Sequence, residues 1–208
     1  MMKTQKRKES TIKKWHFHNP DPGSKNKDSF KILIAFASQF GSTGEVAEAI
    51  GDALCQQDCT VEIKWISDVN QVDAYDAVIV GSAIQYDKWM PEAVDFVKTH
   101  QKALSSVPVA YFFTCLTLAK KNTKTEQQAL VYADKLRAIS SQVVPVSVQG
   151  FAGVVDFSKM SFLTRMMLKA VTTVNGVREG DYREWDAIHA WARSVYFKLS
   201  NEESKVLE

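Results

Sequence analysis

From residue 31 onward, apolar runs of strand length alternate with stretches in which apolar positions recur every three or four residues. The runs are rich in Val, Ile and Phe and lie at 31–37, 60–66, 77–83, 108–114 and 143–148. The stretches with helical period are 44–54, a segment opened by Pro91, 124–141, and a last helix for which we expect Asp181 as cap, with Glu184 completing a capping box. This alternation predicts an α/β domain built on a doubly wound parallel sheet.

Two of the five predicted strands carry signs of an edge position. Residues 60–66 alternate between apolar and polar positions, as a strand covered on one face does. Pro145 in the fifth run cannot donate a backbone hydrogen bond, which argues against a central position for that strand.

The first strand ends in a polar loop, and a helical pattern follows the loop at once. The loop residues are Ser38, Gln39, Phe40, Gly41, Ser42 and Thr43. Backbone N–H groups at a helix start have no internal partner and attract phosphate, and the three hydroxyls would add donors. No lysine follows the glycine, and no Gly-x-Gly-x-x-Gly motif is present, so the loops that bind nucleoside triphosphates or pyrophosphates are excluded. Neutral donors suit a terminal monophosphate, and the commonest cofactor with one is FMN.

The loop resembles the phosphate loop of flavodoxins, which usually reads Thr/Ser-x-Thr-Gly-x-Thr. Phe40 departs from that pattern, because it stands where the family has a hydroxyl. An ordinary turn capped by Ser42 or Thr43 is the alternative explanation of the same residues. The resemblance implies a flavodoxin-like five-stranded parallel sheet in the order 2-1-3-4-5, as a single domain over residues 30–200 with an insertion before the last helix.

In that order, ligands bind outside the carboxyl ends of the first, third and fourth strands. The loop after the third strand contributes Ser82, Ala83, Ile84, Gln85, Tyr86 and Trp89 as candidate cofactor contacts. A flavin ring needs an apolar face to lie on, so Tyr86 is the first candidate for stacking and Trp89 the second. The alternative is that both rings only cover the end of the sheet.

The loop after the fourth strand contributes Thr114, Cys115, Leu116 and Thr117 as further cofactor contacts. It lacks the second aromatic residue with which electron-carrying flavodoxins usually enclose the ring, and the chain has a pI near 8.3 where those carriers are usually acidic. Lys120 and Lys121 follow the loop and are candidates to bind a substrate carboxylate. A solvated helix start is the alternative for these lysines.

About thirty residues, 150–180, intervene before the last helix. They include a Met-rich run, 160–171, in which Arg165 and Lys169 form a basic stripe. Such a helix is typical of a core or dimer contact, and can also rest on a membrane surface or line an apolar pocket. With residues 81–86 and 180–185, this insertion resembles the menaquinone-dependent protoporphyrinogen IX dehydrogenases, over about residues 31–198. The resemblance implies oxidation of a tetrapyrrole by FMN, reoxidation by a quinone, and Lys120, Lys121, Arg165 and Lys169 as propionate contacts.

The remaining composition limits location and partners. Residues 1–29 hold eight Lys or Arg and three acidic residues, a net charge of +5, and we expect them and residues 201–208 to be tails. Trp15 and Phe17 leave contact with an anionic membrane surface open for the first tail. No apolar run approaches the ~20 residues of a membrane-spanning helix, so we expect a cytoplasmic protein, peripheral on the membrane at most. Three cysteines are too few for a disulfide scaffold, and neither a metal nor a nucleic-acid partner is expected.

Two other functions remain open at this point. One is a flavodoxin-type electron carrier that serves protein partners. The other is a flavodoxin fold without cofactor that is used only for binding, which Phe40 in the phosphate loop keeps open.

Overall fold

The computed structural model describes residues 30–57, 59–159, 165–166 and 177–206, with side chains described as far as residue 200. Its strands are β1 (Phe30–Ala37), β2 (Cys59–Trp65), β3 (Ala77–Gln85), β4 (Lys88–Trp89), β5 (Val109–Cys115), β6 (Ser147–Ala152), β7 (Val154–Val155) and β8 (Gly180–Asp181). Its main helices are α1 (Ser42–Leu54), α2 (Pro91–Thr99), α3 (Gln101–Leu104), α4 (Thr123–Arg137) and α6 (Trp185–Val206). Short 3-10 turns are η1 (Ile66–Asp68), η2 (Thr117–Ala119) and η3 (Phe157–Lys159).

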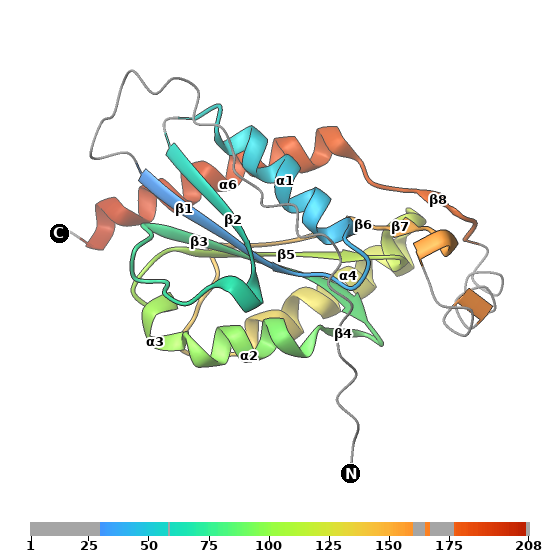
Figure 1. Cartoon of the computed structure of the whole chain (residues 1–208), viewed down its shortest axis with the longest axis horizontal. Helices are drawn as coiled ribbons and strands as arrows, with labels where there is room; N and C mark the ends of the chain where they lie inside the picture. Colours follow the sequence, from blue (N-terminus) through green and yellow to red (C-terminus); the bar gives the residue numbers. More distant parts are fainter. Residues whose placement is uncertain (1–29, 58, 160–164, 167–176, 207–208) are drawn as a thin grey trace, which may run out of the picture.

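The main sheet has the order β2-β1-β3-β5-β6, and these five strands are parallel (Figure 1). The predicted order 2-1-3-4-5 is confirmed, because β4 is an additional two-residue strand that pairs antiparallel with β3. The predicted edge positions of the second and fifth strands are also confirmed. The chain leaves β1 toward β2 on one side and returns to β3 on the other, so the switch point lies between β1 and β3.

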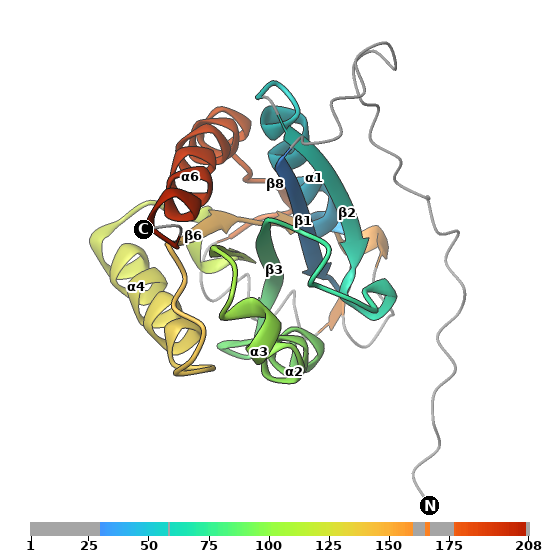
Figure 2. The ribbon, with the colours of Figure 1, turned by 90° about the vertical axis from the view of Figure 1, so that its left-hand side faces the viewer.

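Helices cover both faces of this sheet. Helices α1 and α6 lie on one face, and α2, α3 and α4 lie on the other (Figure 2). Successive residues of β1 divide between the two cores: Ile32 and Ile34 pack with α1 and α6, whereas Leu33 and Ala35 pack with the other helices. All four side chains are fully buried, as the central strand of a parallel sheet requires.

A glycine in β3 leaves room for an aromatic ring of the adjacent strand β5 to lie over it on the α1/α6 face. A Cβ atom at Gly81 would lie 2.1 Å from the Cζ of Phe112. The Phe112 ring continues toward Phe151 and Trp191, with centroid distances of 6.4 Å to each. These rings join β3, β5, β6 and α6 on one face of the sheet.

Four predicted boundaries are wrong. The fifth strand begins at Ser147 in place of Val143, because Pro145 has no N–H and ladder pairing starts only with the Val146 N–H, which donates to the Val109 oxygen (2.8 Å). The last helix begins at Trp185, so Asp181 does not cap it: Asp181 belongs to β8, and its carboxylate is occupied by Arg183. That helix also continues through 201–206, which we expected to be a tail. The fourth helix ends at Arg137, four residues before its predicted end at 141.

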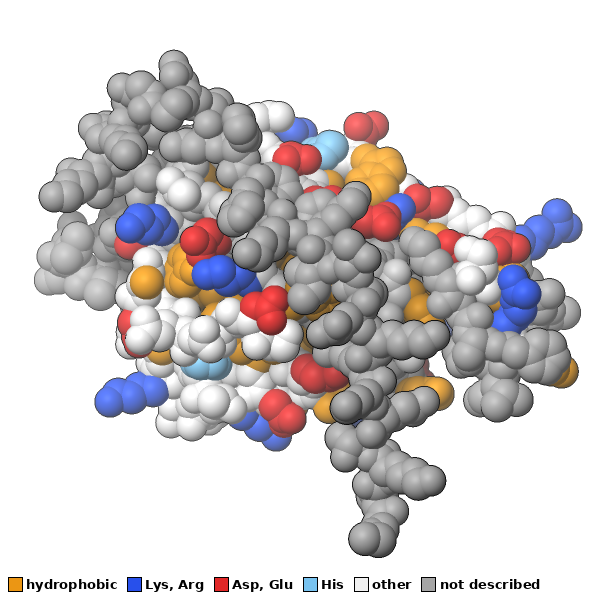
Figure 3. Space-filling view, in the orientation of Figure 1, with side chains coloured by type: hydrophobic (Ala, Val, Ile, Leu, Met, Phe, Trp, Pro, Cys, Tyr) orange, Lys and Arg blue, Asp and Glu red, His pale blue; other side chains and the backbone are white. Residues whose placement is uncertain are grey.

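The surface mixes both charges. On the face in Figure 3, described Lys and Arg side chains are interspersed with Asp and Glu. Within the described ranges, no helix combines the length and the apolarity needed to cross a bilayer. Residues 1–29 and most of the Met-rich run 160–171 lie outside the described residues.

Candidate functional site at the carboxyl edge of the sheet

Three loops meet where β1, β3 and β5 end, because the carboxyl ends of parallel strands share one edge. They are the loop 38–41, the β3–β4 turn at 86–87 and the segment 116–122. The Nε2 group of Gln85 donates a hydrogen bond to the Gln39 Oε1 and so links the first two loops. The structure therefore brings together the three segments in which the sequence placed a cofactor site.

The first loop turns sharply into α1 at Gly41. The backbone of Gly41 has φ +94°, a left-handed conformation that residues other than glycine rarely adopt. No described atom beyond the two neighbouring residues lies within 4 Å of the position that a Cβ atom would take there, so the loop faces open space. The Gly41 N–H donates to the buried Ser38 hydroxyl (2.9 Å), and the Glu45 N–H donates to the Gly41 oxygen (3.2 Å). The N–H groups of the first turn of α1, beginning at Ser42, have no acceptor within the helix. They face the open side of the loop together with the half-buried Ser42 side chain.

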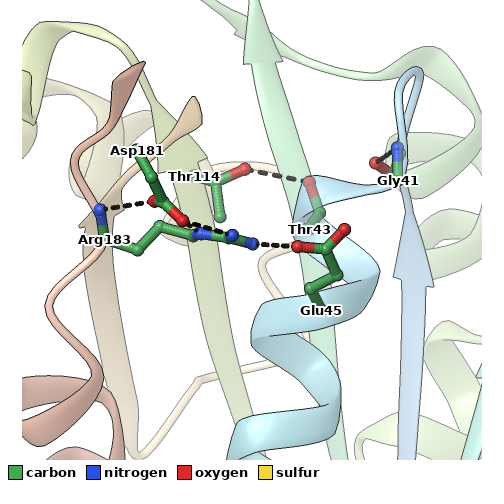
Figure 4. A network of polar contacts seen from close by, with 7 residues as sticks. Gly41, Thr43, Glu45, Thr114, Asp181 and Arg183 are labelled. Atoms are coloured by element: carbon green, nitrogen blue, oxygen red, sulfur yellow. Dashed lines mark hydrogen bonds and ion pairs between the residues drawn. The ribbon is translucent and has the colours of Figure 1, made fainter. Parts of the chain in front are cut away.

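Thr43 does not present its hydroxyl to the loop as expected. Its side chain is fully buried, and its Oγ1 lies 2.9 Å from the Oγ1 of Thr114, which is also buried at the end of β5. This hydroxyl pair joins the start of α1 to the neighbouring strand (Figure 4). The side-chain donors left for an anion are Ser38 and Ser42, and Phe40 beside them is half-buried.

An arginine from the far end of the chain completes this side of the site. The Arg183 guanidinium donates to both carboxylate oxygens of Asp181 (2.8 and 2.6 Å) and to Glu45 in the first turn of α1 (2.5 Å). It also lies 4.4 Å from the centroid of the Trp185 ring. Trp185 is 38% exposed, and its ring packs against this cation. Figure 4 shows the arginine reaching across to α1.

The turn between β3 and β4 has an unusual backbone. Tyr86 has φ 48° and Asp87 has φ 61°, so both central residues of this two-residue turn are left-handed. Such a turn matches the twist of a hairpin but favours Asn, Asp or Gly, and a left-handed conformation costs a tyrosine about 1 kcal/mol. The Tyr86 side chain is 90% exposed at the tip. Ser82 supports the hairpin, because its buried hydroxyl accepts the Met90 N–H (3.1 Å).

Trp89, our second candidate for ring stacking, lies in the core. Its side chain is 4% exposed, and its ring packs against Tyr111 with centroids 5.2 Å apart. The two-residue strand β4 directs Lys88 outward and Trp89 inward, as strand alternation requires. The expectation that Trp89 offers a free ring face to a ligand is wrong, whereas Ala83, Ile84 and Gln85 remain partly exposed along the end of β3.

A cavity of about 430 Å³ lies between the second and third loops and α4. Its lining includes Leu116 and Thr117 from the third loop, Asp87 from the hairpin, and Lys120 and Lys124 at the start of α4. Among the described residues, no ion pair or hydrogen bond engages the ammonium group of either lysine. The cavity therefore combines apolar wall with two cationic groups that are available to an anionic ligand.

The floor of this cavity holds a polar pair that the sequence did not reveal. The hydroxyl of Tyr132, a buried residue of α4, donates to the Asp87 carboxylate. Burial first, and then this hydrogen bond, raise the pKa of Tyr132 to about 12. Nearby Cys115 is buried, which raises the pKa of its thiol to about 11, so it is not a nucleophile at neutral pH.

Lys121 and Arg165, which were also expected to bind propionates, are engaged by other groups of the protein. Lys121 forms an ion pair with Glu184 (2.5 Å). The Nε of Arg165 donates to the Phe157 carbonyl (3.1 Å), and Lys169 lies outside the described residues. Sequence reasoning missed Asp87, Tyr132 and the role of Arg183, although Arg183 stands within the 180–185 segment that carries the family resemblance.

Comparison with known proteins decides the family. A family model described as a flavodoxin domain matches residues 33–180, more than half of the chain. The chain belongs to the flavodoxin-domain family. This flavodoxin-domain protein is 27% identical over 172 residues to a protein of Escherichia coli (strain K12) named protoporphyrinogen IX dehydrogenase (quinone), covering 79% of this chain and 94% of that one.

A protein of the same name from Leishmania major is 28% identical over 172 residues, covering 78% of this flavodoxin-domain chain and 73% of that one. Among solved structures, oxidised flavodoxin 1 from Bacillus cereus matches with a TM-score of 0.44 at 17% identity. That match covers 67% of this chain and 95% of the other.

Proposed function

We propose that the chain is an FMN-dependent oxidoreductase that oxidises protoporphyrinogen IX, or a closely related tetrapyrrole, and passes the electrons to a quinone. Two curated relatives of the chain carry the name protoporphyrinogen IX dehydrogenase (quinone). The observation that carries the proposal is the placement of a phosphate-type loop and a cavity with two available lysines at the same edge of the sheet.

The residues of the first loop fit the phosphate of FMN. Gly41 leaves open space in front of the loop, the first turn of α1 supplies N–H donors, and Ser42 adds a hydroxyl. The loop segment 38–43 has no lysine or arginine, so its donor set is neutral and matches a phosphate monoester better than a metal-bound triphosphate. Ser38 holds the Gly41 N–H, so it shapes the loop and retains its own proton for donation.

The ring would lie between the loops after β3 and β5. Tyr86 is the exposed aromatic residue positioned to cover one face of it, and the end of β3 presents partly exposed Ala83, Ile84 and Gln85. Leu116 and Thr117 would bound the other side. When bound, FMN accepts and donates two electrons, and the protein orients the ring and excludes water.

The cavity fits an amphipathic substrate that carries carboxylates. Its volume of about 430 Å³ lies within the range of small-molecule sites. We propose that Lys120 and Lys124 bind the propionates, whereas Lys121 contributes only if its ion pair with Glu184 opens. Arg165 and Lys169, on the insertion, remain proposed contacts for the outer part of the substrate.

Asp87 is the described carboxylate nearest to this space. It lines the cavity, it accepts the Tyr132 hydroxyl, and its carbonyl is 3.5 Å from the Lys135 ammonium. These contacts fix the hairpin tip beside the substrate space.

A quinone acceptor is lipid-soluble, so the proposal includes a cytoplasmic protein that touches the membrane peripherally. Arg165 and Met166 support this contact, because a cation stands next to an apolar side chain that is 57% exposed. Co-sedimentation with anionic vesicles tests it, and full recovery of the protein in the supernatant would contradict it.

The proposed reaction is tested by anaerobic mixing of the FMN-reconstituted protein with protoporphyrinogen IX. We expect the flavin absorbance near ~450 nm, a property of the cofactor itself, to bleach, and to return when a quinone is added. A flavin that binds but stays oxidised would favour the electron carrier. Failure to bind FMN at all would contradict the phosphate loop assignment.

A further inference from the structure

We infer that Arg183 is a positioning residue that makes the loop 38–43 selective for the phosphorylated flavin. The inference rests on the proposed FMN site and adds a residue to it from the opposite end of the chain. Arg183 lies 138 positions from Glu45 in the sequence, and the side chains of both meet beside the start of α1.

The carboxylate of Glu45 would repel a phosphate at the start of α1 unless a nearby cation offsets its charge. Glu45 is the acidic residue of the first turn of α1, at the end of the helix where the phosphate is expected. A carboxylate in the first turn favours the helix itself, since it complements the helix dipole. The same carboxylate opposes a second anion that binds at that helix end, and the phosphate of FMN carries nearly two negative charges at neutral pH.

Arg183 offsets this repulsion by direct contact. Its guanidinium donates to the Glu45 carboxylate at 2.5 Å, and two further hydrogen bonds to Asp181 fix its orientation. Glu45 and Asp181 carry two negative charges against the single positive charge of the arginine. Without Arg183, its neutralisation of both carboxylates would be lost, and the potential at the start of α1 would become more negative.

Burial makes this charge effective. The Arg183 side chain is 7% exposed, so solvent screens it far less than an ordinary surface arginine. The Trp185 ring, 4.4 Å away, covers one side of the guanidinium. Because the arginine is held by β8 and the start of α6, closure of the chain's last segment onto α1 completes the electrostatic environment of the phosphate loop.

A comparison of FMN with riboflavin isolates this effect, because riboflavin has the same ring and lacks the phosphate. Both ligands are titrated into the apoprotein, and the quenching of flavin fluorescence gives the two dissociation constants. For Arg183→Gln we expect FMN to bind about tenfold more weakly, while riboflavin changes less than about twofold. Arg193→Gln, an exposed arginine of α6, is the matched control and should alter neither constant.

The double variant Arg183→Gln/Glu45→Gln tests the mechanism. Removing the carboxylate that the arginine neutralised should return the ratio of the two dissociation constants to within about threefold of the original protein. Glu45→Gln alone should tighten FMN by about threefold and leave riboflavin unchanged. This single variant keeps the inference testable even where Arg183→Gln does not fold.

Equal weakening of FMN and riboflavin in Arg183→Gln would show that Arg183 only holds the fold together, and would overturn the inference. An unchanged ratio in Glu45→Gln would overturn it as well. Failure of the proposed function would be seen in the unsubstituted protein, which would then bind FMN and riboflavin equally or bind neither of them.

Discussion

The two ends of the candidate site are built in opposite ways. At the phosphate end, Thr43 is buried against Thr114, and Arg183 is buried against two carboxylates. At the ring end, Tyr86 is 90% exposed on a left-handed turn. The Lys120 ammonium there makes no hydrogen bond or ion pair with another described residue, and the lysine lines the cavity. The phosphate end therefore holds its geometry through protein contacts alone. The ring end exposes surface that a ligand would cover, so we expect it to supply much of the binding free energy.

The largest effect should follow from a change to the backbone of the phosphate end. Gly41→Val places a β-branched residue at φ +94° and should cost about 1–2 kcal/mol of stability. Because the loop must then move, FMN should bind about 100-fold more weakly, a loss of roughly 2.7 kcal/mol. Isothermal titration calorimetry measures this change. Gly153→Ala is the control, since its Cβ would meet only ordinary contacts from 3.7 Å outward.

A second large effect concerns the ring end. Tyr86→Ala removes the exposed stacking candidate, and FMN should bind about 30-fold more weakly through lost area and ring contact. The free energy of unfolding should stay the same or rise slightly, because the side chain has few contacts to lose. Lys120→Ala should leave FMN affinity unchanged, and equal effects of the two variants would contradict the stacking assignment.

The cavity lysines should affect the substrate and not the cofactor. In Lys120→Ala/Lys124→Ala, the KM for protoporphyrinogen IX should rise about tenfold, since charge-assisted contacts to two carboxylates are lost. Steady-state kinetics of the FMN-loaded protein gives this value. Lys121→Ala, whose lysine is paired with Glu184, is the control and should change KM less than about twofold.

At the phosphate end, Thr43 and Thr114 should be energetically coupled. Thr43→Val leaves the Thr114 hydroxyl buried without its partner and should cost about 1 kcal/mol of unfolding free energy in urea. Thr114→Val should cost a similar amount, and the double variant less than the sum of both. Full additivity would show that the hydroxyl pair contributes nothing.

The sequence pattern predicted the alternation of elements, and the resemblance to flavodoxins implied the sheet order and therefore the loops that form the site. It failed where a distant contact decides a local structure. Asp181 looked like a helix cap, but its carboxylate binds Arg183, and the helix begins at Trp185. Trp89 looked like a ligand contact, but alternation in the short β4 turns it into the core.

The contacts that make the phosphate end rigid are also long-range. Thr43 and Thr114 are 71 positions apart, and Glu45 and Arg183 are 138 apart. Local periodicity carries no signal for such pairs. The backbone strain at Tyr86 was equally invisible, because tyrosine is not a typical left-handed turn residue, although Asp87 beside it is one.

The smallest predicted effect is a dependence on pH. The hydrogen bonds that Arg183 donates to Asp181 lower the pKa of this carboxyl group in the folded protein. The pair therefore stabilises the fold above the ordinary carboxyl pKa of about 4, and this contribution is lost as the pH falls from there through the lowered pKa. Thermal unfolding from pH 6 to pH 3 should show a smaller decrease in Arg183→Gln than in the original protein. Equal decreases would mean that this pair does not contribute.

A crystal structure of the chain with FMN tests the central claim most directly. We expect phosphate oxygens within hydrogen-bond distance of the N–H groups at the start of α1, beginning at Ser42, with the Gly41–Ser38, Thr43–Thr114 and Arg183–Glu45 contacts unchanged and Tyr86 against the ring. A phosphate bound beside Lys120 and Lys124, or a phosphate end that rearranges on binding, would contradict it.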